Sequence, residues 1–88
     1  MRRFALADGF LLLREERMLV HPGSKTMRKY NEPAMMIIEA LAERERNVGD
    51  ILADLSRRSC RDLTESDVMC FIESLLENGV AVECRRDI

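Results

Sequence analysis

Residues 64–79, TESDVMCFIESLLENG, have the pattern of one complete helix, from its start to its end. Thr64 and the aspartate three residues later form the capping-box pattern of a helix start, and Asn78-Gly79 form a glycine-containing end. At about 100° per residue, the apolar side chains fill one broad arc. The arc comprises Val68, Met69, Phe71, Ile72, Leu75 and Leu76. It is wide enough to face two surfaces at once, so this helix is expected to border more than the core.

Two further helices are expected upstream of this stretch. The first has Asn31 as its cap and Pro33 in its first turn, and it ends near Arg44. The second begins within residues 47–50 and ends around Ser59. Its apolar stripe consists of Val48, Ile51, Leu52 and Leu55.

The first third of the chain has the pattern of strands. An apolar run at residues 9–14 ends at a charged hairpin tip, residues 15–17, and a second run follows at residues 18–20. The proline and glycine within residues 21–25 supply a second reversal. Residues 26–30 are then expected to form a third, half-exposed edge strand. In that strand one face carries Thr26, Arg28 and Tyr30, and the other carries Met27 and Lys29.

This order predicts an α+β domain of winged-helix character, with a three-stranded antiparallel sheet followed by three helices. A short extended segment at residues 80–83 follows, and it is either a fourth strand or a packed extension. A sheet of three strands cannot bury both faces by itself, so the helices must cover one of them. The length of 88 residues favours a single domain over residues 1–88.

The composition indicates a folded, water-soluble chain with no strong preference for phosphate. Hydrophobic residues make up 47% and charged residues 34%, and the formal net charge is -2, which disfavours non-specific nucleic-acid binding. Basic residues cluster at Arg2-Arg3, at residues 57–61 and at Arg85-Arg86, as parts of a mixed-charge surface. No signal sequence and no membrane span are expected, and a cytoplasmic location fits.

Groups able to carry out catalysis are scarce. His21, the single histidine, falls in a turn without an evident partner, and the four glycines are too far apart to cradle a phosphate. Cys60, Cys70 and Cys84 contain no C-x-x-C pair, so we expect thiols in a reducing compartment and no zinc site. Neither an enzyme nor a cofactor is therefore expected.

Three segments carry a resemblance to a known family. They are residues 10–16, FLLLREE; residues 18–34, MLVHPGSKTMRKYNEPA; and residues 67–80, DVMCFIESLLENGV. The chain resembles the PqqD-like family, the RiPP recognition element fold, from about Phe4 to Val82. The step from Tyr30 to Asn31 is similar to the family's apolar-Asn-x-x-Ala segment. The last segment is similar to its Asp-Val-x-x-Phe-Leu-x-x-Leu-x-x-x-Gly helix.

The resemblance implies a non-catalytic domain that binds the leader segment of a ribosomally made precursor peptide. The leader would add as a strand beside the third strand, against the third helix, and be presented to a modifying enzyme, often a radical S-adenosylmethionine protein. An unpaired edge beside an apolar helix face suits this mode on physical grounds as well. The expected peptide-binding residues are Thr26, Met27, Arg28, Lys29, Tyr30, Val68, Met69, Phe71, Ile72 and Leu75. Several of the helix residues must instead fill the core, and the pattern does not separate them.

The edge strand departs from the family pattern. Tyr30 stands where an aliphatic residue is usual, and Arg28-Lys29 make the strand basic. One interpretation is that the bound leader carries acidic side chains. The other is that both charges protect an open edge against aggregation.

Two other functional classes remain open. A winged-helix DNA-binding regulator could use the same helices in the major groove, although the acidic balance argues against it. Salt-sensitive DNA binding would favour the regulator, whereas leader binding would favour peptide delivery. A structural subunit or a homodimerisation module is the third alternative, and the mass of the domain in solution would reveal it.

Overall fold

The structure is a computed structural model that describes residues 2–58 and 63–84. Its strands are β1 (Arg3–Leu6), β2 (Leu11–Leu13), β3 (Met18–His21), β4 (Thr26–Lys29) and β5 (Ala81–Cys84). Its helices are α1 (Glu32–Glu43), α2 (Val48–Arg57) and α3 (Glu65–Glu77). The predicted α+β class, with an antiparallel three-stranded sheet followed by three helices, is confirmed.

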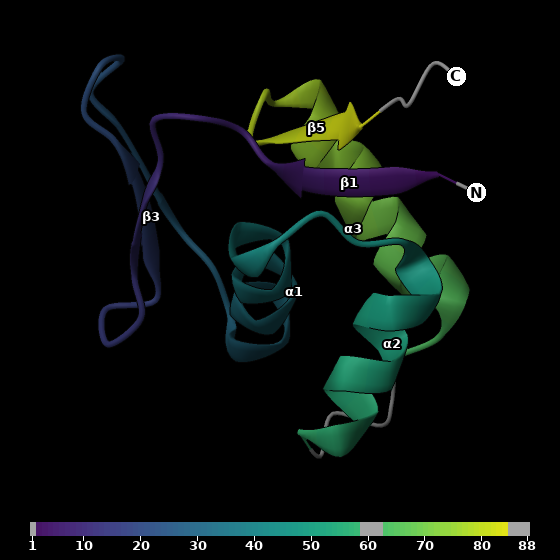
Figure 1. The fold of residues 1–88 in the computed structure, drawn as a ribbon. Helices are drawn as coiled ribbons and strands as arrows, with labels where there is room; N and C mark the ends of the chain where they lie inside the picture. The colour runs from purple at the N-terminus through teal and green to yellow at the C-terminus, as the bar shows by residue number, and fades with distance from the viewer. Residues whose placement is uncertain (1, 59–62, 85–88) are drawn as a thin grey trace.

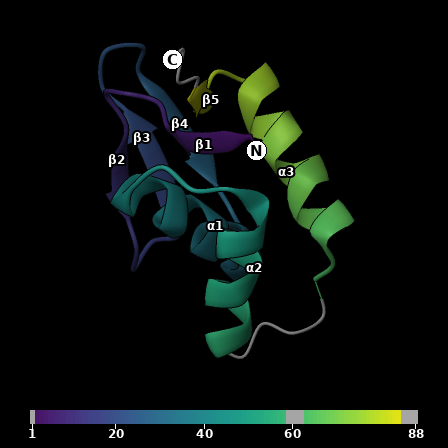
Figure 2. The ribbon, with the colours of Figure 1, turned by 45° about the vertical axis from the view of Figure 1, so that its right-hand side comes forward.

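The strands form two separate antiparallel sheets. One has the order β2-β3-β4, and the other consists of β1 and β5. Helix α1 lies between the three-stranded sheet and α2, and the β1–β5 pair lies beside α3 (Figure 1). In Figure 2, β2 and β3 lie at the left of the molecule and α3 lies at the right.

Strand β1 was absent from the sequence-based prediction, which placed the first strand at residues 9–14. The structure begins β2 at Leu11, because Gly9 has a φ of +91° in the turn that precedes it. Arg3–Leu6 becomes a strand through distant partners: Arg3 pairs with Cys84 and Leu6 with Ala81. The segment at residues 80–83 is therefore a strand in the second sheet, which decides between its two predicted alternatives.

The helix boundaries follow their caps. The Asn31 side chain accepts the Ala34 N–H at 3.0 Å, and the Asn47 side chain accepts the Asp50 N–H at 2.8 Å. Helix α1 ends at Glu43, close to the predicted end. Helix α2 ends at Arg57, and the predicted end at Ser59 lies outside the described residues, as do Cys60, Arg61 and Arg85-Arg86.

Both predicted ends of α3 are confirmed. The Thr64 hydroxyl accepts the Asp67 N–H at 3.1 Å, and the Asp67 carboxylate accepts the Thr64 N–H at 3.0 Å. At the other end Gly79 has a φ of +75°, its N–H donates to the Leu76 carbonyl, and the Val80 N–H donates to the Leu75 carbonyl at 2.9 Å. These two bonds form a Schellman motif, which reverses the chain into β5.

The core lies where the helices meet the two sheets. Helix α1 contributes the most side chains to it, α2 and α3 contribute one side each, and β1 and β3 add one large residue each. Its fully buried large side chains are Phe4, Leu19, Ile38, Leu41, Ile51, Leu55, Val68, Ile72, Leu75 and Val80. Among the described helices, none is long and apolar enough to cross a membrane.

Candidate functional site

Strand β4 is an open edge of the three-stranded sheet. Within the described residues it pairs only with β3, from Met18 opposite Lys29 to His21 opposite Thr26. The Tyr30 N–H donates to the Arg17 carbonyl at 3.0 Å, which extends the pairing by one residue. Backbone groups alternate in direction along an antiparallel strand, so the N–H and C=O groups of Met27 and Lys29 face the open edge.

The side chains of β4 alternate as predicted. Thr26, Arg28 and Tyr30 are half-buried, whereas Met27 is 64% exposed and Lys29 is exposed. The half-buried set lies on the face of the sheet that the helices cover. The side chains of this inner face therefore adjoin any segment that adds to the edge.

An apolar pocket of about 450 Å³ opens at the carboxyl end of β4. Its apolar lining comes from the residue after β4, the first two turns of α1, the segment just before α3 and the first half of α3. It consists of Tyr30, Pro33, Ala34, Ile37, Leu63 and Phe71. Lys29, Asn31 and Asp67 complete it. The rings of Tyr30 and Phe71 meet edge to face, with centroids 6.0 Å apart and planes at 88°. This geometry is favourable for aromatic pairs and fixes the pocket wall.

A smaller, polar pocket of about 210 Å³ opens at the other end of β4. Its polar lining consists of Asp8, His21, Ser24, Thr26, Arg28 and Asn78. The Asn78-Gly79 end of α3 stands across it from Thr26 and Arg28. We refer to the two pockets together as the β4–α3 cleft, because each has β4 on one side and α3 on the other.

His21 organises the turn at this polar end. Its Nδ1 accepts the Ser24 N–H at 3.0 Å, and its ring packs on Phe10 with centroids 4.7 Å apart. A Cβ atom added at Gly9 would stand 2.6 Å from the His21 Nε2 atom. The ring thus holds the β3–β4 turn from one side and the loop before β2 from the other.

Tyr30 and Arg28 influence each other at the middle of the cleft. Burial raises the pKa of the Tyr30 phenol above its ordinary value of 10.0, and the positive charge of Arg28 opposes that rise. The neutral phenol is therefore the form that the cleft favours.

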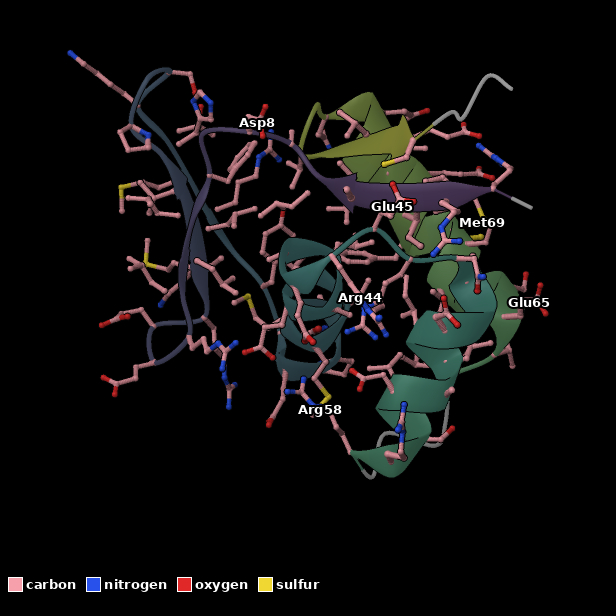
Figure 3. All side chains as sticks on the ribbon, viewed as in Figure 1. Asp8, Arg44, Glu45, Arg58, Glu65 and Met69 are labelled. Carbon is pink, nitrogen blue, oxygen red and sulfur yellow. The ribbon has the colours of Figure 1, made fainter. Side chains whose placement is uncertain are left out.

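The predicted residues of α3 separate into three groups. Phe71 lines the apolar pocket beside Tyr30. Val68, Ile72 and Leu75 are 0%, 0% and 1% exposed, so they lie in the core beneath the helix. Met69 lines another pocket with Arg2, Asn47, Val48, Gly49 and Glu65. Figure 3 shows Met69 and Glu65 on the side of the molecule away from the three-stranded sheet.

The structure thus brings together Thr26, Arg28, Lys29, Tyr30 and Phe71 from the predicted set, with the backbone of Met27 on the same edge. Among the further lining residues, which the sequence-based set did not contain, are Asp8, Pro33, Ala34, Ile37, Leu63 and Asn78. Pro33 and Ala34 could have been found, because they follow Tyr30 in the chain and any pocket beside Tyr30 includes the first turn of α1. No such signal marks Asp8 or Leu63, which only the tertiary fold brings near.

Within the described part of the chain, no three His, Cys, Asp or Glu side chains are grouped so that they could hold a metal ion. Cys70 is an exposed thiol on α3. The cleft therefore offers hydrogen-bonding backbone, an apolar hollow and two cations, Lys29 at the apolar pocket and Arg28 at the polar pocket.

A protein-family model described as "Coenzyme PQQ synthesis protein D (PqqD)" matches residues 16–81. The chain belongs to the PqqD family. Proteins of the PqqD family are non-catalytic, peptide-binding chaperones in the biosynthesis of pyrroloquinoline quinone and of ribosomally made, modified peptides. The matched segment includes β3, β4 and all three helices, and hence most of the cleft, whereas β1 and β2 precede it. Neither the curated proteins nor the solved structures include a match to this chain.

Proposed function

We propose that this chain binds the leader segment of a ribosomally synthesised precursor peptide by strand addition at β4 and presents it to a modifying enzyme. The observation that carries the proposal is the coincidence of an open strand edge with a helix wall. Met27 and Lys29 offer backbone groups at the edge, and Phe71 lines the pocket beside them. The family of the chain supports peptide binding in general.

Backbone pairing supplies the sequence-independent part of the binding. An added strand pairs with two N–H and two C=O groups, those of Met27 and Lys29. Each such hydrogen bond contributes about 0.5–1.5 kcal/mol net, so pairing alone gives weak binding. Side-chain burial in the apolar pocket must supply most of the remaining affinity, at roughly 25 cal/mol per Å² of apolar surface removed from water.

The cleft suits presentation, because it covers one flank of the peptide only. Side chains of the added strand that point to the same face as Met27 and Lys29 remain in solvent. The segment that follows the leader then leaves the edge without passing through the protein. A modifying enzyme reaches that segment while the leader stays bound.

We propose that the partner is a radical S-adenosylmethionine enzyme, on the strength of the family resemblance. We also propose that residues 1–88 act as one peptide-binding domain in the cytoplasm, where the exposed Cys70 thiol stays reduced.

The test is a titration of isotope-labelled protein with synthetic peptides made from the N-terminal segments of the short open reading frames that neighbour its gene. Amide resonances of Met27 and Lys29, together with those around Phe71, are expected to shift most. Lys29→Pro should weaken the binding at least about tenfold, because it removes one edge donor and places a ring in the path of the added strand.

Two control variants separate edge blockage from other effects. Lys29→Ala keeps the backbone N–H and should retain most of the affinity. Leu12→Pro places proline at the opposite edge of the same sheet, where the Leu12 backbone also faces outward, and should leave the affinity of the folded protein unchanged. Equal losses from Lys29→Pro and Leu12→Pro would rule out strand addition at β4.

A further inference from the structure

Arg28 differs from the other basic residues of the described chain. Six arginines lie between 2.9 and 3.4 Å from a glutamate oxygen: Arg2, Arg3, Arg14, Arg17, Arg46 and Arg58. Lys25, Lys29, Arg44 and Arg57 have no such pair but are exposed. Within residues 2–58 and 63–84, Arg28 alone is half-buried and has no ion pair. Its guanidinium has a hydrogen-bonding interaction with the Tyr30 hydroxyl, which is a neutral partner, so no carboxylate balances the charge of this half-buried cation.

The register of β4 determines which residue of an added strand faces Arg28. Met27 and Lys29 direct their backbone groups to the edge, so they form the hydrogen-bonded pairs with an antiparallel partner. The partner residue opposite Arg28 then sits in a non-hydrogen-bonded pair. In such pairs the side chains on one face are closest, with Cβ atoms about 4.5–5.5 Å apart.

The same register places a second side chain in the apolar pocket. In an antiparallel partner, the residue opposite Tyr30 comes two positions before the residue opposite Arg28. Both side chains point to the inner face, the first toward Phe71 and Ile37 and the second toward the polar pocket.

Resting on the function proposed above, we propose that the cleft selects a leader with a large apolar residue followed, two positions toward its carboxyl end, by Asp or Glu. The apolar side chain fills the pocket beside Tyr30 and Phe71. The acidic side chain completes the ion pair that Arg28 lacks. Lys29 also lines the apolar pocket, but its side chain is exposed on the outer face of β4, so we assign the acidic residue to Arg28.

Asp8 is the one carboxylate of the polar pocket that faces the incoming acid. It is exposed, and none of the ion pairs between described residues joins it to Arg28. Figure 3 shows it on the connection between β1 and the three-stranded sheet. Its negative charge opposes an acidic ligand, so Asp8→Asn is expected to strengthen the binding of an acidic peptide about two- to threefold, as for a screened surface charge.

The test uses short labelled peptides in a Thr/Ser host, with the central triplets Leu-Thr-Asp, Leu-Thr-Asn and Asp-Thr-Leu, and fluorescence anisotropy as the readout. Leu-Thr-Asp should bind about five- to tenfold more tightly than the other two, since a partly desolvated ion pair contributes about a factor of ten. The Asp-Thr-Leu peptide is the strict control, because it reverses the order of the two selected residues and keeps the composition and charge of the peptide.

A charge exchange identifies the protein side of the pair. Arg28→Glu should reduce binding of the Leu-Thr-Asp peptide about tenfold or more and should favour a Leu-Thr-Lys peptide instead. Arg44→Glu makes the same change of charge on an exposed residue after α1 and should leave the peptide ranking as it is. Thermal unfolding of each variant confirms that it is folded.

The outcomes separate this inference from the proposed function. One outcome would overturn the proposed order of an apolar residue followed by an acidic one, which we call the order rule. In it, the genuine leader shifts the amide resonances of β4, but the three peptides bind alike and Arg28→Glu does not change their affinities. Strand addition at β4 would then still hold. Tighter binding of Asp-Thr-Leu would likewise overturn the order rule. Binding of neither the leader nor any peptide would remove the proposed function itself.

Discussion

Helix α3 has two sides with different surroundings, although the residues that define them are neighbours in the chain. Ile72, with Val68 and Leu75, is buried in the core. Phe71, one residue earlier, stands at the cleft with its ring against Tyr30. A step of one residue turns the side chain by about 100° around a helix, and here that turn leads from the core to the β4–α3 cleft, the proposed binding surface. Stability and recognition can therefore be separated by adjacent substitutions.

The largest effect, a loss of folding stability, is expected from Ile72→Ala. This variant removes a fully buried side chain and should lower the free energy of unfolding by about 2–5 kcal/mol, as core truncations do. Urea denaturation followed by circular dichroism measures the loss. At low denaturant, the remaining folded protein should still bind the leader with little change in affinity.

Phe71→Ala is the matched variant on the side of α3 that faces the cleft. The side chain is only half-buried, so the loss of stability should be smaller than that of Ile72→Ala, whereas leader affinity should fall about tenfold or more as an aromatic wall disappears. If both variants lost the same stability and the same affinity, the two sides of α3 would not be distinct.

The sequence predicted the helix but not this separation. The amphipathic arc contained Val68, Phe71 and Ile72 together, because periodicity reports which side chains are apolar and not what covers them. The direction of the core from α3 depends on where α1 and the sheets lie. Met69 shows the same limit, since it belongs to the arc yet lines a pocket beside Asn47 and Gly49.

The second sheet also could not be predicted from the local sequence pattern, whereas elements with local sequence signals were predicted well. Asn31 and Thr64 cap their helices as expected, and Asn47 caps α2 within the predicted start at residues 47–50, because a cap is decided by residues three positions apart. Arg3–Leu6 has no such signal. Its strand exists because β5 and the Phe4–Arg46 bridge hold it, and both partners are distant in sequence.

An effect of intermediate size is expected on the stability of the protein at acid pH. It comes from the titration of Asp67 at the start of α3. Its hydrogen bonds from Thr64 lower the carboxyl pKa below the ordinary value of 3.8, with the backbone N–H as the main cause. A depressed pKa in the folded state stabilises the protein above 3.8, and that contribution is lost as the pH falls through the folded value.

Asp67→Asn removes this titration and tests the effect. The wild-type melting temperature should therefore drop more steeply than that of Asp67→Asn below about pH 4, and the two curves should run parallel near neutrality. Glu65→Gln, in the same turn but outside the capping box, should keep the wild-type slope. Parallel wild-type and Asp67→Asn curves at acid pH would mean that the Thr64 hydrogen bonds do not lower the pKa of the Asp67 carboxyl.

The smallest effect is a spectroscopic shift at Tyr30, which reports the cleft side of α3 directly. Tyr30 is the only tyrosine and the chain has no tryptophan, so tyrosinate absorbance follows this group alone. Burial should place its midpoint above 10.0 in the folded protein. The neutral phenol thus contributes stability below that range, and the contribution is lost as the pH rises through the folded value.

Substitutions around Tyr30 should move this midpoint in opposite directions. Arg28→Ala should raise it further, because the opposing positive charge is removed. Phe71→Ala should bring it back toward 10.0 by exposing the ring to water, whereas Ile72→Ala should leave it unchanged at a pH where the variant stays folded. A bound leader should cover Tyr30 and raise the midpoint, so the titration detects occupancy of the apolar pocket without any label. An equal response to Phe71→Ala and Ile72→Ala would mean that Tyr30 senses the stability of the fold and not the wall of the cleft.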